Sequence, residues 1–123
     1  YVEEAIGVAR AARAAGLPVS ISFTVETDGR LPTGQTLASA IEEVDAASDD
    51  YPAYYMINCA HPEFLESAAV PPALWHRLIG LQGNASAMDH DQLDATPGHH
   101  EDDLTAWGGA MLALRRRMGL PER

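Results

Sequence analysis

Residues 19–25 read Val-Ser-Ile-Ser-Phe-Thr-Val, which alternates large apolar side chains with small hydroxyl side chains at the two-residue period of a β-strand. One face of this strand is therefore apolar, and the other is small and polar. In a parallel barrel the apolar face would meet the surrounding helices, while Ser20, Ser22 and Thr24 would point to the interior. A half-exposed strand of an ordinary sheet fits the same alternation, so this stretch alone leaves both interpretations open.

Helical and strand patterns alternate on both sides of residues 19–25. Upstream, apolar residues recur at helical spacing from Val2 to Ala15, and Gly16 and Pro18 end the pattern. This alternation predicts an α/β fold with a parallel sheet and right-handed crossovers. The downstream elements that we predict are, in chain order, a helix with Leu37, Ile41 and Val44, a strand over 53–59, a short helix from Pro62, a helical turn with Leu74, Trp75 and Leu78, a strand over 79–83, and a final helix from 101 with Leu104, Trp107, Met111 and Leu114.

The number of strands bears on whether the fold is complete. Residues 53–59 are apolar nearly throughout, as expected of a parallel strand covered on both faces. Three strands with two open edges would expose unpaired backbone groups and favour self-association. The chain has 123 residues, below the roughly 250 of an eight-stranded α/β barrel, so we expect it to be the middle of a larger closed structure. A flavodoxin-like domain is the weaker alternative, because it needs about five strands.

Composition and charge argue against several classes of function. The formal net charge of −10 disfavours a nucleic-acid-binding surface, which requires clustered Lys and Arg. The basic cluster at 115–117 falls in the last turn of a predicted helix, where cations complement the helix dipole. No apolar run reaches the ~18 residues of a membrane span, and the N-terminus lacks a signal-peptide pattern, so we expect a cytoplasmic protein without membrane partners. A single cysteine agrees with a reducing compartment.

Polar residues follow or end each predicted strand. Cys59 ends the second strand and is preceded by Asn58, Thr24 ends the first, and Asn84 and Ser86 follow the third. Parallel α/β folds present catalytic residues at these carboxyl ends, so the five side chains would share one rim if the strands are neighbours. Two alternatives stay open: a cysteine at a strand end is often a small buried hydrophobe, and Asn or Ser often only satisfies turn backbone.

The histidines of the loop over 84–100 suggest a second possible metal site. His90, His99 and His100 lie among acidic residues. Adjacent histidines do not share a helical face, however, and this loop is rich in Pro, Gly and acids, so a solvated connection is favoured. Glycine-rich phosphate loops and the Gly-x-Ser-x-Gly and Cys-x-x-Cys patterns are missing from the sequence.

Several stretches closely resemble the homocysteine S-methyltransferase family, and the similarity runs nearly end to end. They are Tyr-Val-Glu-Glu-Ala at 1–5, Pro-Val-Ser-Ile-Ser-Phe-Thr-Val-Glu-Thr-Asp-Gly-Arg-Leu at 18–31 with Gly34 and Leu37, Tyr-Met-Ile-Asn-Cys-Ala-His-Pro at 55–62, and Gly-Leu-Gln-Gly-Asn-Ala-Ser at 80–86 with Leu93-Asp94. The resemblance implies a (β/α)8 TIM barrel that holds zinc at the carboxyl ends of its strands. It places residues 1–123, as a single-domain fragment, from helix 4 to helix 7 of that barrel, with parallel strands 5, 6 and 7.

The same resemblance implies the roles of individual residues. The family's Asn-Cys motif, matched by Asn58-Cys59, supplies one zinc thiolate, and a later Gly-Gly-Cys-Cys motif supplies two more. That later motif is absent from this chain. Cys59 is thus implied as a metal ligand, and no catalytic residue is assigned. For Thr24, Asn58, Asn84 and Ser86 we propose roles that line the pocket or orient a ligand, since hydrogen bonds to a zinc thiolate or polar contacts to the amino acid are physically sensible uses of these side chains.

The function implied by the resemblance is a transferase of methionine biosynthesis. It moves a methyl group from a sulfonium or ammonium donor to zinc-bound homocysteine, and the fragment alone is expected to be inactive. The partners would be homocysteine and a small methyl donor, whose identity the sequence leaves open. The alternative is a non-catalytic α/β domain or degenerate paralogue that acts as a binding or interaction module.

Overall fold

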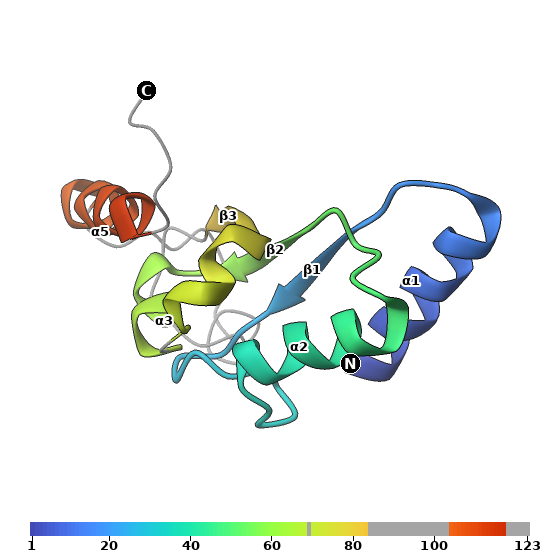
Figure 1. Cartoon of the computed structure of the whole chain (residues 1–123). Coiled ribbons are helices and arrows are strands. Elements are labelled where there is room, and N and C mark those ends of the chain that lie inside the picture. The colour runs from blue at the N-terminus through green and yellow to red at the C-terminus, as the bar shows by residue number, and fades with distance from the viewer. Residues whose placement is uncertain (69, 84–103, 118–123) are drawn as a thin grey trace, which may run out of the picture.

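The computed structural model describes residues 1–68, 70–83 and 104–117, so the predicted loop over 84–100 lies outside the described part. Helices and strands alternate through these residues, as the sequence predicts (Figure 1). No helix among them is long and apolar enough to cross a membrane. The elements are α1 (Val2–Ala15), β1 (Ser20–Thr24), α2 (Leu37–Ser48), β2 (Tyr54–Ala60), α3 (Pro62–Ser67), the 3-10 helix η1 (Pro72–Arg77), β3 (Leu78–Gly83) and α5 (Leu104–Arg117).

The described strands form one parallel sheet in the order β1-β2-β3. Thr24 lies opposite Asn58, and Asn58 lies opposite Gln82, so the three strands end at the same edge of the sheet. The prediction of a parallel α/β fold is confirmed. A sheet of this kind occurs in open α/β folds as well as in closed barrels, and the barrel itself stays a prediction.

The two faces of the sheet differ in burial. Apolar side chains on one face form the core with the helices, and they include Ile21, Phe23, Tyr55, Ile57 and Leu78. The opposite face, which we call the open face, carries residues that are exposed or half-buried; they are Ser20, Ser22, Thr24, Tyr54, Met56, Asn58, Gly80 and Gln82. In β2 the side chains of Tyr54, Met56 and Asn58 lie on the open face and are half-buried, so the described residues bury this strand fully on one face only.

The helices pack against one another in pairs. α1 contacts α2, and α3 contacts α5. Local signals set their ends: Gly16 terminates α1 with φ 67°, and the Thr36 side chain accepts a hydrogen bond from the Ser39 backbone N–H at the start of α2. The structure shifts two predicted boundaries, since Leu78 begins β3 instead of ending the preceding helical turn, and α5 is described from Leu104.

The connection after β1 packs against the helix that follows β2. Gly29 in this connection has φ 76°, and a Cβ added there would collide with the backbone of Ala68 and Phe64. Leu31, two residues on, is buried in the core. The segments that follow β1 and β2 are thus in close contact, which fixes their positions beside the carboxyl ends of both strands.

Candidate functional site at the carboxyl ends of the strands

Three polar side chains form a row across the carboxyl ends of the sheet. Thr24 of β1, Asn58 of β2 and Gln82 of β3 occupy successive register positions. The Thr24 hydroxyl donates a hydrogen bond to Oδ1 of Asn58 at 2.9 Å. The structure therefore brings together two of the residues predicted from the sequence and joins them directly.

Gln82 is a member of this row that the sequence interpretation missed. Its side chain is exposed, next to Asn58 in register. The alternation of side chains along a strand is the signal that could have indicated it. Gly80 and Gln82 are two residues apart in β3, so they lie on the same face, and they pair with Met56 and Asn58 on the open face. The register that aligns Gln82 with Asn58 could not be read from the sequence.

Cys59 occupies an irregular position in the backbone of β2. Asn58 pairs with Gln82 and Ala60 pairs with Gly83, so a step of two residues along β2 corresponds to a step of one residue along β3. Cys59 is the residue that this bulge leaves without a register partner in β3. Bulges are common beside active sites, where they interrupt the regular alternation of a strand. The Cys59 side chain, like Asn84 and Ser86, lies outside what the structure describes.

His61 follows the Asn-Cys pair and acts as a helix cap. Its side chain is 3% exposed, and Nδ1 accepts a hydrogen bond from the Glu63 backbone N–H at 3.3 Å. Its ring lies 6.2 Å from the Phe64 ring, between centroids. Because Nδ1 is used in this way, the neutral tautomer carries its proton on Nε2. His61 therefore ends β2 and begins α3, and this capping role was not predicted.

The described residues do not form a complete metal site. Among residues 1–68, 70–83 and 104–117, no group of three or more His, Cys, Asp or Glu side chains is placed to hold a metal ion. A structural or catalytic zinc needs at least three protein ligands. The described residues therefore do not fit a resident zinc ion by themselves. His90, His99 and His100 lie outside the described part.

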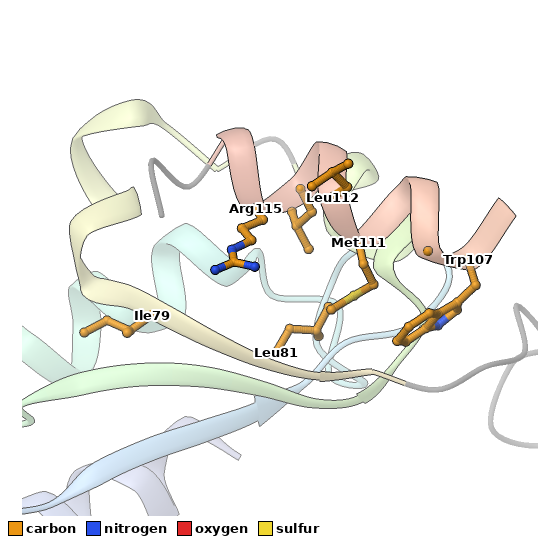
Figure 2. Close-up of a pocket in the computed structure, with 8 residues that line it drawn as sticks. Ile79, Leu81, Trp107, Met111, Leu112 and Arg115 are labelled. Carbon is orange, nitrogen blue, oxygen red and sulfur yellow. The ribbon is translucent and has the colours of Figure 1, made fainter. Parts of the chain in front are cut away.

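A separate hollow lies between β3 and α5, on the helix side of the sheet. Its volume is about 390 Å³, and its lining is almost wholly apolar. Figure 2 shows Trp107 and Met111 of α5 pointing toward the strand that carries Ile79 and Leu81. Leu81 pairs in register with the buried Ile57, so this hollow is on the face opposite the Thr24–Asn58 pair. It has no part in the candidate site.

A network of charged and polar side chains lies at the other end of the sheet. The Arg77 guanidinium donates to both carboxylate oxygens of Asp45, at 2.8 and 3.0 Å, and the Tyr55 hydroxyl donates to Asp45 at 2.8 Å. Burial of Tyr55, together with the adjacent Asp45 carboxylate, raises the pKa of the Tyr55 phenol. Tyr55 is the second residue of β2, remote along the strand from Asn58, so this network joins α2, β2 and η1 and serves stability.

The described residues thus form an α/β structure with a parallel sheet and a row of polar side chains at the carboxyl ends of its strands, the edge at which parallel α/β enzymes hold their substrates. A comparison with protein families matches residues 1–114 to the family described as homocysteine S-methyltransferase. The chain therefore belongs to the homocysteine S-methyltransferase family, and the resemblance seen in its sequence is confirmed. Comparisons with curated proteins and with solved structures gave no match.

Proposed function

We propose that this chain forms part of an enzyme that transfers a methyl group from a sulfonium or ammonium donor to the sulfur of homocysteine. The observation that carries the proposal is the family match over residues 1–114. The position of the Thr24–Asn58 pair supports it, since these polar side chains lie at the edge where parallel α/β enzymes hold their substrates.

The chemistry is a displacement at the methyl carbon. The homocysteine sulfur loses its proton to solvent and forms a bond to that carbon, while the bond from the carbon to the donor sulfur or nitrogen breaks and its electron pair stays with the donor. The products are methionine and the demethylated, uncharged donor centre. A thiolate attacks far better than a thiol, and a zinc ion held by thiolates would supply it by lowering the pKa of the bound homocysteine thiol.

In this proposal Cys59 provides one zinc ligand, and the other protein ligands come from residues outside those described. Its support is the matched Asn58-Cys59 motif and the bulge that sets Cys59 apart from the regular ladder of β2. Thr24, Asn58, Asn84 and Ser86 are proposed to line the substrate pocket. The open face, with its small Ser20 and Ser22, is proposed to form part of the interior of a (β/α)8 barrel.

The test combines zinc content with methionine formation in the full-length protein. Cys59→Ala should lower bound zinc, measured by atomic emission, and reduce methyl transfer from a panel of sulfonium and ammonium donors by at least ~100-fold, because a lost ligand disrupts the metal site. Thr33→Ala, at an exposed position of the connection after β1, should change neither quantity. Full zinc content and full activity in the Cys59 variant would rule out the proposed ligand role.

The same assay separates the enzyme from the alternative. A full-length protein that binds no zinc and methylates homocysteine with none of the donors would support a non-catalytic interaction module. The 123-residue chain, assayed alone, is expected to be inactive, because one thiolate cannot complete a tetrahedral zinc site.

A further inference from the structure

We infer that Thr24 is a positioning residue that fixes the orientation of the Asn58 side-chain amide, so that the amide N–H groups are presented to an anionic group of the substrate. This inference rests on the proposed function and deepens it. It starts from the hydrogen bond of 2.9 Å that the Thr24 hydroxyl donates to Oδ1 of Asn58. Both side chains are half-buried on the open face.

An asparagine amide has two nearly isosteric ends with opposite hydrogen-bonding properties. Rotation by about 180° exchanges the acceptor Oδ1 with the donor Nδ2, and little in the shape of the group opposes this exchange. In the observed pair Thr24 is the donor and Oδ1 of Asn58 is the acceptor, whereas the exchanged amide would turn Nδ2 toward Thr24 and require the hydroxyl to rotate and accept. The parallel register holds Thr24 opposite Asn58 in the sheet, so the donor stays in place.

This orientation determines what Nδ2, the nitrogen of the Asn58 amide, can bind. With Oδ1 occupied by Thr24, the two Nδ2 protons of Asn58 are left to donate elsewhere. No acceptor within the described residues bonds to this nitrogen, and the next residue in the row, Gln82, is also an uncharged amide. The row itself contains no cation. A group recognised here would therefore be met by neutral N–H donors, which suit a carboxylate or a thiolate.

Homocysteine carries both anionic groups, and the two can be distinguished by removing one. The compound 3-aminopropane-1-thiol keeps the thiol and the amine but lacks the carboxylate. If Asn58 contacts the carboxylate, a change at Asn58 should matter for homocysteine and lose its effect for the shortened compound. If Asn58 contacts the sulfur, the effect should persist for both compounds. Either result supports the inference and identifies the group.

The decisive variants remove a single feature each. Asn58→Asp keeps the acceptor for Thr24 and replaces the N–H donors by a carboxylate oxygen, so kcat/KM for homocysteine should fall by about 100-fold. Thr24→Val keeps the shape and removes the hydroxyl, and kcat/KM should fall by about 10-fold as the amide rotates. Thr24→Ser, which keeps the hydroxyl, should restore kcat/KM to within about 3-fold of the wild-type value. Wild-type kcat/KM in both Asn58→Asp and Thr24→Val would overturn the inference.

A readout independent of activity separates this inference from the proposed function. In the 1H–15N spectrum, the Asn58 side-chain amide should give one sharp pair of signals in the wild type and in Thr24→Ser. In Thr24→Val it should give broadened or doubled signals. Unchanged amide signals in Thr24→Val would refute the positioning role even if the enzyme is active. If the wild type transfers no methyl group but the amide signals respond as expected, the proposed function fails and the positioning role stands.

Discussion

Arg77 holds Asp45 with two parallel hydrogen bonds, of 2.8 and 3.0 Å, across 32 positions of sequence. The two side chains are only 17% and 13% exposed, and Arg77 also donates to the backbone oxygens of Pro52 and Ala53. The guanidinium carbon lies 5.3 Å from the centroid of the Tyr55 ring. This ion pair thus connects α2, η1 and the start of β2, and its geometry is bidentate, the strongest form of such a pair.

Loss of this ion pair should be costly. Arg77→Met leaves Asp45 largely buried without its cation, so we expect the free energy of unfolding to fall by roughly 3 kcal/mol, near the lower end of the range for buried pairs. The matched control is Arg13→Met, which breaks a pair with Asp49 of 3.0 Å whose side chains are 51% and 80% exposed. That change should cost less than about 1 kcal/mol, because exposed pairs contribute little. Urea denaturation measures both, and equal losses would contradict the assigned role of Arg77.

The Tyr55 phenol makes stability depend on pH in the alkaline range. Its pKa in the folded protein is raised above the ordinary value of 10.0, first by burial and then by Asp45. The folded state therefore keeps a proton that the unfolded state releases, and the contribution of Tyr55 to stability is complete below pH 10 and declines as pH rises further. Thermal melts between pH 8 and pH 11 should show a steeper decline for the wild type than for Tyr55→Phe. Parallel declines would show that this phenol does not cause the effect.

Gly29 and Gly34 offer a matched pair of glycine substitutions. Both have positive φ, of 76° and 88°, but only at Gly29 would a Cβ collide with backbone, that of Ala68 and Phe64. Gly34→Ala should cost about 1 kcal/mol, from conformational strain alone. Gly29→Ala should cost clearly more, ~3 kcal/mol, because the connection after β1 must also move away from α3. Similar values from chemical denaturation would argue against the close packing of these segments.

In the part of the chain that the structure describes, β3 lies at one edge of the sheet, and this edge and the hollow beside it should promote association of the 123-residue chain. Ile79 lies on this edge strand, is 45% exposed and lines the hollow with Trp107 and Met111. Ile79→Lys should lower the association constant measured by sedimentation equilibrium by about 10-fold or more, because a charge on an edge strand opposes pairing. Val8→Lys, at a position on α1 that is 52% exposed, should leave association unchanged. A monomeric wild-type chain at high concentration would refute the prediction.

Most of the secondary structure was predictable, because its signals are local. The helix over Val2–Ala15 has the predicted bounds, and the alternation in residues 19–25 gives the two faces of β1 correctly. Such patterns depend on neighbours two to four residues apart. The bounds of β3 were less accurate, because Leu78 fits both the end of a helical turn and the start of a strand, and its pairing with Tyr55 in the sheet decides between them.

The candidate site was predictable only in part. Strand ends identified Thr24 and Asn58, and the family resemblance singled out Cys59, whose zinc ligation stays a prediction. Gln82 and the capping role of His61 were missed. The first depends on the register between β2 and β3, including its irregularity between Tyr55 and Met56, and the second on the geometry with which β2 turns into α3. Neither has a signature in a short stretch of sequence.

The sequence by itself determined the order of helices and strands, the polar face of β1 and the family to which the chain belongs. Only the tertiary structure decided that Thr24 donates to Asn58, that Gln82 extends their row, and that Arg77 pairs with Asp45. The physical reason is how far apart in the sequence the interacting residues lie. Periodicity and capping act within a few residues, whereas these contacts join residues 24 or more positions apart, and their formation depends on strand register and on the packing of the whole core.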